Sequence, residues 1–452
     1  MSKSQRIYDN SPIWFQNIMV SAKGYQNQGH RYGKKYWEFR EFYRNFDTWP
    51  LERKLEYQNE QLRRFMEYAR THSKFYRELY EGIDLSRIRT PKDLKWLPIV
   101  DKEMLREHIE DVITIPRKGA LEGHTGGTTG KSLVVLNTVE DGMARMALLD
   151  HFKARVGFEH RKMRRATFNG KHIVPPKQIK KVFWRYNHSC KQMIYSSFHL
   201  SEKNLQAYID SMNRFKPQSI DGFFTSMCDV AGYIERNKIE LTFKPIAIFP
   251  TSETVTQIGR ELLERVFKCP VYNQYASSEG APFVTECVEH HLHIEHASGV
   301  FENFEDSDEI LVTSFTTHGT PLIRYRIGDS MVFSNKKCAC GNDSLLVEEI
   351  QGRSLDFLYT SEGAKINGGN IANLFKNMPN SIIRAQLIQE KIGEIKILIE
   401  IDQKRYKPEF DNLLKDEFGH KFGLETKITI EHVDGIPREK SGKYRLIVNS
   451  VL

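Results

Sequence analysis

Residues 123–132 read GHTGGTTGKS, a stretch rich in glycine and in hydroxyl side chains. Glycine lets a backbone approach a ligand closely. The backbone N–H groups of this stretch, together with Thr128, Thr129 and Lys131, could therefore surround a polyphosphate. The phosphate-binding loop of kinases and ATPases requires a glycine five residues before the glycine of its Gly-Lys-Ser end, and Thr125 stands there instead. The pattern predicts a phosphate cradle of another kind, and a plain loop is the alternative.

Four polar segments downstream could bind other parts of a nucleotide. Tyr275 in YASSEG offers a flat face for a purine, and Glu279 in the same segment offers oxygen ligands for Mg²⁺. Asp329, in YRIGD, follows a tight turn and could accept hydrogen bonds from ribose hydroxyls. Arg353, in GRS, has a planar donor fork for phosphate or ribose oxygens, and Lys443, in SGKYR, could neutralise charge on a phosphoryl group. Each segment alone also fits a structural role.

Cysteine and histidine are concentrated in two further segments, CVEHHLH (287–293) and CACG (338–341). Thiolates and imidazoles at this density are typical of tetrahedral zinc sites, although Cys-x-Cys is a weaker signal than Cys-x₂-Cys. Reduced, partly buried cysteines beside surface histidines are the alternative. Cys190, Cys228 and Cys269 are expected to be small buried residues, because six scattered cysteines do not make a disulfide framework.

Length and composition limit what the chain can be. A chain of 452 residues is too long for one core and predicts two or three domains, and 40% hydrophobic residues suit a globular protein. No apolar run approaches the roughly 20 residues that span a bilayer. The start, MSKSQRIYDN, lacks the apolar segment of a secretory signal, so a cytoplasmic location is expected. The net charge of +8 is mild for this length and does not indicate a nucleic-acid partner.

Positive charge is concentrated in residues 161–185, which contain nine Lys or Arg residues and no acidic residue. The simpler interpretation is a solvated basic face. The alternative is a patch for a phosphorylated ligand, a carrier or a membrane surface. The sequence leaves both interpretations open.

The elements that must position these residues change in type near residue 120. Residues 1–120 are predicted to be mostly helical, because apolar residues recur at helical spacing in 51–80 and two short helices with capping signals follow in TPKDLKWLPIVDKEMLREHI. Short apolar strands then alternate with helices, as in SIDGFF before SMCDVAGYIERN and KPIAIFPTSE before TVTQIGRELLERVF. This alternation predicts an α/β fold with mainly parallel sheets covered by helices and with ligands at the carboxyl ends of strands.

A strand-rich stretch follows in DEILVTSF and PLIRYRIGDSMVF. After Gly352 the pattern restarts as a small α+β unit, with strands at GEIKILIEI and KITIEHV and a helix between them. We therefore expect a helical lead-in over 1–120 that belongs to a large domain. The ATP- and acyl-binding core of that domain is expected over 121–352, and a small mobile C-terminal lid domain over 353–452.

The five motifs HTGGTTGKS, YASSEG, YRIGD, GRSLD and SGKYR follow one another in the order found in a known superfamily. The chain resembles adenylate-forming enzymes of the acyl-CoA synthetase superfamily, and within it the phenylacetate-CoA ligase branch. That branch includes related proteins of capsule and surface-polysaccharide biosynthesis. The resemblance extends to the helical lead-in, through SKFYRELY and LPIVDKEMLREH, and so covers nearly the whole chain.

The resemblance implies a reaction in two steps. A carboxylate attacks the α-phosphate of ATP, which gives an acyl-adenylate and pyrophosphate, and an acceptor such as the thiol of CoA or of a carrier protein then displaces AMP. Catalysis would rest on positioning and charge stabilisation. Transferred residue by residue, the resemblance implies that Glu279 binds Mg²⁺. It also implies that Glu279, Arg353 and Lys443 are the catalytic residues. It assigns ATP binding to Thr125, Gly126, Gly127, Thr128, Thr129, Gly130, Lys131, Ser252, Glu253, Tyr275 and Asp329.

Some members of the same branch hold structural zinc through Cys-x₅-His and Cys-x-Cys. Cys287, His293, Cys338 and Cys340 fit that spacing, with His290 or His291 as substitutes for His293. The chain also departs from the family pattern. Serine replaces the common proline after Gly-Lys in the phosphate loop, and Leu355 replaces the first aspartate of the hinge, which leaves Asp356. The second change puts in doubt how rotation of the small domain is set.

Other functions remain open at this stage. A kinase or ATPase would leave YRIGD and SGKYR unexplained, and a non-catalytic scaffold of a polysaccharide assembly system is encouraged by Leu355 alone. A ligase of surface-polysaccharide biosynthesis could transfer an acyl or aminoacyl group to a non-CoA acceptor. Phe223 and Phe224 could form an apolar wall of the acyl pocket, or they could belong to the core. The acyl substrate, the acceptor and the oligomeric state are not predicted.

Overall fold

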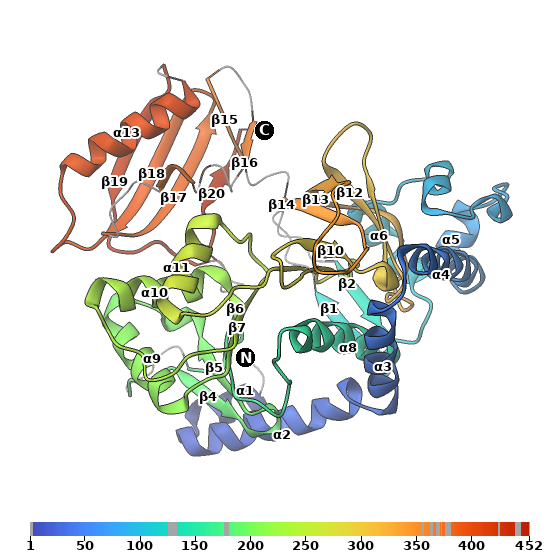
Figure 1. Ribbon diagram of the computed structural model, residues 1–452, viewed down its shortest axis with the longest axis horizontal. Helices are drawn as coiled ribbons and strands as arrows, with labels where there is room; N and C mark the ends of the chain where they lie inside the picture. Colours follow the sequence, from blue (N-terminus) through green and yellow to red (C-terminus); the bar gives the residue numbers. More distant parts are fainter. Residues whose placement is uncertain are drawn as a thin grey trace. The chain divides into compact units, whose positions relative to one another are not determined.

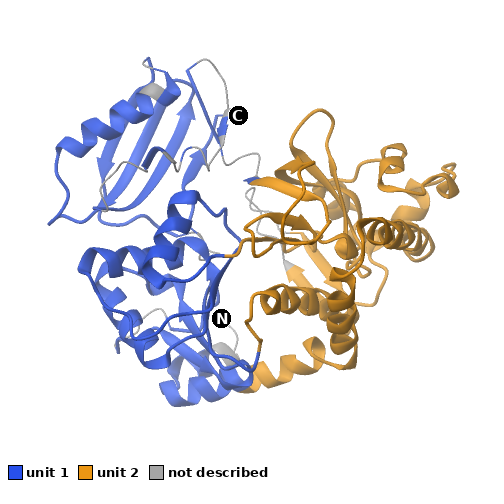
Figure 2. Ribbon diagram, in the orientation of Figure 1, with its two compact units in different colours: residues 1–21, 161–271, 351–452 blue, residues 22–160, 272–350 orange. Residues whose placement is uncertain are grey.

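The structure of the protein is a computed structural model with two compact units. Unit 1 comprises residues 1–21, 161–271 and 351–452, and unit 2 comprises residues 22–160 and 272–350 (Figure 2). The predicted division at residues 120 and 352 stays a prediction. Among the described residues, no helix is long and apolar enough to cross a membrane. The structure describes residues 3–124, 133–175, 180–353, 357–361, 365–367, 371, 373–375, 381–423, 425–438 and 444–451.

A five-stranded sheet lies at the centre of unit 1. Its strand order is β4-β5-β3-β6-β7, in which the last four strands are parallel and β4 is an antiparallel edge. Helices that follow the strands cover the sheet and bury a core with Phe168, Tyr208 and Leu263 (Figure 1). The predicted α/β fold class is confirmed. The elements are β3 (Arg165–Asn169), β4 (Trp184–Asn187), β5 (Gln192–Ser196), α9 (Glu202–Phe215), β6 (Ser219–Phe223), α10 (Phe224–Asn237), β7 (Ala247–Thr251) and α11 (Gln257–Phe267), with 3₁₀ turns at His188–Cys190 and Ser197–His199.

Gly222 explains how β6 fits beside β3. Its φ is +122°, and a Cβ atom built there would lie 1.7 Å from the carbonyl oxygen of Phe168. Any larger residue would collide with the neighbouring strand at this point. The glycine therefore sets the close approach of the two central strands at their carboxyl ends.

Two helices precede this sheet in the sequence, α1 (Lys3–Asn10) and α2 (Ile13–Arg31), and their residues up to Ser21, which belong to unit 1, pack beside β4 (Figure 1). The C-terminal part of unit 1 is a four-stranded sheet in the order β19-β18-β17-β20. Its core contains Leu387 and Ile397 from the sheet and Phe418 from the helix α13 that crosses it. The elements are the hairpin β15 (Phe357–Tyr359) and β16 (Lys365–Asn367), then Asn373–Phe375 as a 3₁₀ turn, β17 (Ile382–Lys391), β18 (Glu394–Ile401), α13 (Glu409–Phe422), β19 (Lys427–His432) and β20 (Ile447–Asn449).

Unit 2 is built on a seven-stranded sheet in the order β11-β12-β13-β14-β10-β9-β8, whose determined pairings are antiparallel. Helices from the N-terminal region pack on it and share a core that includes Phe65, Tyr76 and Tyr325. The helices are α3 (Lys34–Asp47), α4 (Leu51–His72), α5 (Lys74–Leu79), α6 (Lys102–Glu107), α7 (Ile109–Val112) and α8 (Val139–Arg155), with 3₁₀ turns at Leu85–Arg87, Pro91–Trp96 and His296–Ser298. The strands are the hairpin β1 (Leu121–His124) and β2 (Val134–Asn137), then β8 (Gln274–Tyr275), β9 (Val284–Glu286), β10 (Leu292–Ile294), β11 (Gly299–Asn303), β12 (Glu309–Ser314), β13 (Leu322–Ser334) and β14 (Leu346–Arg353).

The predicted capping signals form as expected. Asp93 accepts hydrogen bonds from the Thr90 backbone N–H and from the Thr90 hydroxyl, both at 2.9 Å, at the start of the 3₁₀ turn Pro91–Trp96. Asp101 accepts a hydrogen bond from the backbone N–H of Met104 at 2.9 Å and starts α6. These bonds satisfy N–H groups that a helix start otherwise leaves unpaired.

Candidate functional site

The turn that carries Glu279 is held by its own side chains. The Ser277 hydroxyl accepts hydrogen bonds from the backbone N–H groups of Gly280, at 3.2 Å, and Ala281, at 3.0 Å. Gly280 has a φ of +107°, and a Cβ atom there would lie 2.5 Å from Thr317. The YASSEG segment is therefore a fixed turn in unit 2, and the Glu279 side chain on it is 7% exposed.

Arg145, on α8, binds the backbone of the same turn. Its Nη1 donates to the carbonyl oxygens of Gly280, at 2.8 Å, and Ala281, at 2.9 Å, and its guanidinium lies 4.5 Å from the ring centre of Phe283. Burial lowers the pKa of Arg145 to about 10, which leaves the side chain charged at neutral pH. Sequence reasoning missed this residue, because it lies 135 positions before Gly280 in a helix without a motif.

Tyr275 and Asp329, two of the residues predicted to bind ATP, are in direct contact. The Tyr275 hydroxyl donates to Asp329 Oδ2 at 2.7 Å. Tyr275 comes from β8 and Asp329 from β13, and the tyrosine ring is 8% exposed. The bond fixes the direction of the Asp329 carboxylate and keeps an acceptor in place for a ligand hydroxyl.

Ser252 and Glu253 follow β7 in unit 1. Ser252 takes a left-handed conformation, with φ of +68°, and its side chain is exposed. The Glu253 carboxylate accepts hydrogen bonds from the Thr225 backbone N–H at 2.8 Å and from the Thr225 hydroxyl at 3.0 Å. It thus caps the first turn of α10, where a negative charge is favourable. Burial nevertheless raises the pKa of the Glu253 carboxyl.

Glu253 also contacts the C-terminal part of unit 1. The backbone N–H of Tyr444, the residue after Lys443, donates to Glu253 Oε1 at 3.4 Å. The segment that follows Lys443 is therefore next to the turn after β7.

A buried group of ion pairs joins the same two parts of unit 1. Asp229, on α10, accepts from Arg384 Nη2 at 2.7 Å and from Arg438 Nη2 at 2.7 Å. Arg384 lies on β17 and also contacts Glu400 at 3.3 Å. The side chains of Asp229, Arg384 and Arg438 are 7%, 10% and 8% exposed. Sequence reasoning did not identify these residues, because each lies in a different segment and none belongs to a recognisable motif.

The other predicted residues, apart from the zinc ligands, either pack in the core or are not described by the structure. Arg353 ends β14, but its side chain is not described. Phe224, considered for the acyl pocket, packs in the core of the five-stranded sheet. The remaining predictions fall on residues that are not described: Thr125, Gly126, Gly127, Thr128, Thr129, Gly130, Lys131, Leu355, Asp356 and Lys443.

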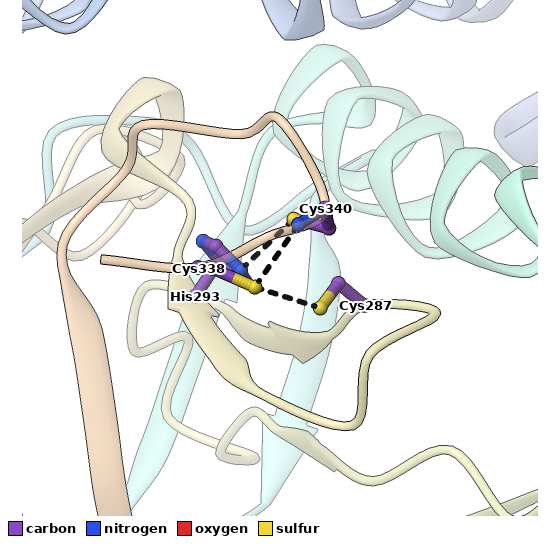
Figure 3. Close-up of side chains that lie close together, drawn as sticks. All are labelled: Cys287, His293, Cys338 and Cys340. Atoms are coloured by element: carbon purple, nitrogen blue, oxygen red, sulfur yellow. Dashed lines mark hydrogen bonds between the residues drawn. The ribbon is translucent and has the colours of Figure 1, made fainter. Parts of the chain in front are cut away.

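The four predicted zinc ligands lie together in unit 2. One ligand atom from each of Cys287, His293, Cys338 and Cys340 lies within 4.8 Å of every other, and Figure 3 shows the side chains directed toward a common point. The Sγ atoms of Cys287 and Cys338 are 3.6 Å apart, and His293 Nε2 is 3.4 Å from Cys340 Sγ. Burial raises the pKa of the Cys287 thiol to about 12 and lowers that of His293. A neutral imidazole is the form that binds metals.

The two alternative histidines differ from His293. His290 Nδ1 lies 2.9 Å from Glu286, and its ring stacks on Tyr272. His291 Nδ1 lies 3.2 Å from Cys338 Sγ but on the exposed side. The Nδ1 atom of His293 faces the Ser344 carbonyl at 3.2 Å, which leaves Nε2 toward the cysteines. The geometry thus favours His293 as the fourth ligand.

Comparison with known proteins gives the class to which this fold belongs. A solved structure of 2-hydroxyisobutyryl-CoA ligase, in its postadenylation state with an acyl-AMP, matches with a TM-score of 0.71 at 15% identity, over 89% of this chain and 91% of that chain. The phenylacetate-coenzyme A ligase of Thermus thermophilus is 20% identical over 447 residues, covering 89% of this chain and 98% of the relative. The fold is that of the AMP-forming ligases of the adenylate-forming superfamily.

The family within this superfamily is shown by a nearer relative. Protein CapK of Staphylococcus aureus is 38% identical over 450 residues, which cover 98% of this chain and 99% of the relative. The family model for the CapK C-terminal domain matches residues 358–450. The chain therefore belongs to the CapK family, and its fold is that of the adenylate-forming ligases, so the resemblance inferred from the five motifs is confirmed.

Proposed function

We propose that the protein activates a carboxylic acid with ATP as an acyl-adenylate, releases pyrophosphate, and transfers the acyl group to a thiol such as that of CoA. The observation that carries the proposal is the hydrogen bond between Tyr275 and Asp329, in the adenylate-forming fold. It orients the carboxylate of YRIGD beside the aromatic residue of YASSEG, as a nucleoside site requires.

Each described residue then has a defined role. Asp329 accepts hydrogen bonds from the ribose hydroxyls, and Tyr275 holds that carboxylate while offering part of its ring to the adenine. Glu279 supplies a carboxylate oxygen for Mg²⁺, a cation that prefers oxygen ligands and bridges phosphates. The supports from Arg145 and Ser277 fix Glu279 before the nucleotide arrives, so that less order has to be imposed during binding.

Ser252 and Glu253 are proposed to flank the adenine, as the resemblance implies. The Tyr444 backbone bonds to Glu253. Lys443, which precedes Tyr444 in the sequence, is proposed to offset with its ammonium group the negative charge that develops on the α-phosphate. The segment Thr125–Lys131, with Arg353, would bind the remaining phosphate oxygens.

Zinc is proposed to occupy the cluster of Cys287, His293, Cys338 and Cys340. A tetrahedral zinc with Zn–S near 2.3 Å and Zn–N near 2.0 Å sets its ligand atoms roughly 3.4–3.8 Å apart. The separations of 3.6 Å between two sulfur atoms and 3.4 Å between sulfur and nitrogen fit that geometry. Four protein ligands leave no open position for a substrate, so the site would be structural.

The test is ATP–pyrophosphate exchange with a panel of carboxylic and amino acids. We expect exchange with at least one acid, and a decrease of roughly 10²-fold or more in Asp329→Asn and in Lys443→Ala. Glu394→Gln, which changes an exposed carboxylate on β18, is the control and is expected to retain full exchange. Release of ADP, or failure of the wild type to bind ATP, would contradict the proposal.

The acceptor is tested with the acid that this panel identifies. AMP release is followed after addition of CoA, a carrier protein or an amino compound such as an amino sugar nucleotide. Thioester formation with CoA supports the proposed thiol acceptor. AMP release with an amino acceptor alone would instead support the surface-polysaccharide ligase that the resemblance leaves open.

A further inference from the structure

Residues 13–21 of helix α2, which belong to unit 1, pack against the rest of that unit through polar side chains. Gln16, which is 2% exposed, accepts a hydrogen bond from Arg185 Nε at 2.6 Å. Asn17 Oδ1 accepts from the Tyr186 backbone N–H at 2.9 Å. Ser21 Oγ accepts from the His188 backbone N–H at 3.0 Å, and Val20 adds an apolar contact. A surface helix usually buries an apolar stripe instead.

Large apolar side chains of the same region face solvent. Trp14 and Ile18 are 64% and 53% exposed, Phe15 is 36% exposed, and Ile7 on α1 is 60% exposed. Trp14 and Ile18 are four residues apart and so share one face of α2, about 160° around the helix from Gln16. The helix thus points amides into the protein and an indole and an aliphatic chain outward. Exposed apolar residues that gather on one face mark an interaction surface.

The segment on which α2 packs is rich in positive charge. Residues 161–201, which include β4, contain ten Lys or Arg residues and no acidic residue. Part of this charge is internal, because Arg185 is fully buried and Arg165 pairs with Asp221 at 3.2 Å. Lys180 and Lys181 are exposed, at the approach to β4 on which α2 packs.

Two more exposed cations lie along α1. Arg6 is exposed on the helix itself. The Tyr8 hydroxyl donates to the Ile173 carbonyl at 2.5 Å, which ties α1 to the segment that begins with the exposed Lys171. We call the set Ile7, Trp14, Phe15, Ile18, Arg6, Lys171, Lys180 and Lys181 the aromatic–basic face.

We propose that the aromatic–basic face docks on an anionic membrane surface. Tryptophan and other apolar side chains enter the boundary between head groups and acyl chains when a helix lies in the plane of the interface. Lysine and arginine are attracted to anionic head groups and keep their charges in water. A second copy of the chain suits the face less well, because a two-fold dimer would set the same cations against each other.

Co-sedimentation with vesicles tests the proposal, and it uses the full chain without ATP or acyl substrate. We expect binding to vesicles of phosphatidylcholine with phosphatidylglycerol and much weaker binding to phosphatidylcholine alone. The double variant Trp14→Ser with Ile18→Ser is expected to bind roughly tenfold less or weaker. Trp96→Ser is the matched control, since Trp96 is 67% exposed in unit 2, and it is expected to bind as the wild type does.

A charge variant separates the electrostatic contribution. Lys180→Glu with Lys181→Glu is expected to reduce binding to the anionic vesicles by roughly tenfold or more, with an unchanged melting temperature. Binding that is the same in the wild type and in both double variants would overturn the proposal, as would failure of the wild type to sediment. Light scattering that shows a wild-type dimer and a monomeric Trp14/Ile18 variant, without vesicle binding, would assign the face to self-association instead. Because no nucleotide is needed, these outcomes are independent of the proposed ligase activity.

Discussion

Replacement of Asp229 by asparagine is expected to weaken the contact between α10 and the C-terminal part of unit 1. The carboxylate bonds to Arg384 Nε at 3.1 Å and Nη2 at 2.7 Å, and to Arg438 Nη2 at 2.7 Å. All three side chains are at least nine-tenths buried. Water therefore cannot solvate the two arginine side chains in the variant unless the contact rearranges.

The expected loss of unfolding free energy depends on the interactions that remain in the variant. Removal of one partner from a buried ion pair costs about 3–5 kcal/mol, because the remaining charge is buried without compensation. Arg384 keeps Glu400 at 3.3 Å, and the asparagine side chain still offers one oxygen acceptor. These two remaining interactions lower the expected loss to about 2–3 kcal/mol in the free energy of unfolding.

The loss in the free energy of unfolding is measured by urea titration. Hydrogen exchange is expected to rise in β17 and in α10, on the two sides of the contact. The control is Glu394→Gln, which breaks an exposed pair with Lys391 at 3.9 Å and is expected to change stability by less than about 0.5 kcal/mol. A loss in Asp229→Asn that equals the loss in the control would refute the reasoning.

The purified protein is expected to contain about one zinc per chain by elemental analysis, and Cys338→Ser should lose the metal and melt at a lower temperature, whereas Cys190→Ala should keep it. Gly222→Ala is expected to destabilise the protein by about 3 kcal/mol or to prevent folding, because its Cβ atom would lie 1.7 Å from a carbonyl oxygen of β3. Gly435→Ala, where nothing lies within 4 Å of the new atom, is the control in the same urea titration. Burial lowers the pKa of His296 to about 4 from 6.5, so below pH 6.5 the unfolded chain binds a proton that the folded protein does not. The free energy of unfolding is therefore expected to fall between pH 6.5 and about 4, by up to about 3 kcal/mol, and less steeply in His296→Asn; equal slopes in the two proteins would contradict the assignment.

Much of the fold could be predicted from local sequence patterns. The strand at SIDGFF and the helix after it appear as β6 and α10, and KPIAIFPTSE contains β7. Such strands can be recognised from a short stretch of sequence, because a parallel strand that is buried on both faces is mostly apolar along its length. The order of the seven-stranded sheet could not be read in this way. It places β14 beside β10, a pairing between segments some fifty residues apart that no local pattern specifies.

The candidate site shows the same division. Glu279, Asp329 and the Cys/His set could be named because each lies in a short motif whose residue types suggest a ligand. Arg145 and Asp229 could not, since their roles depend on carbonyl groups and side chains far away in the sequence. The basic segment 161–185 was ambiguous for a related reason. Charge alone does not show that Arg185 is buried while Lys180 is exposed.

The Cys/His cluster has a consequence for the unfolded chain. Cys287 and Cys338 are 51 positions apart, so a bound metal ties the β9–β10 hairpin to the connection that follows β13. Closing a loop of that length removes conformational freedom from the unfolded chain. By the relation used for covalent cross-links, this is equivalent to about 4 kcal/mol at room temperature. The metal would then act as a removable cross-link across the segment that holds β10 to β13.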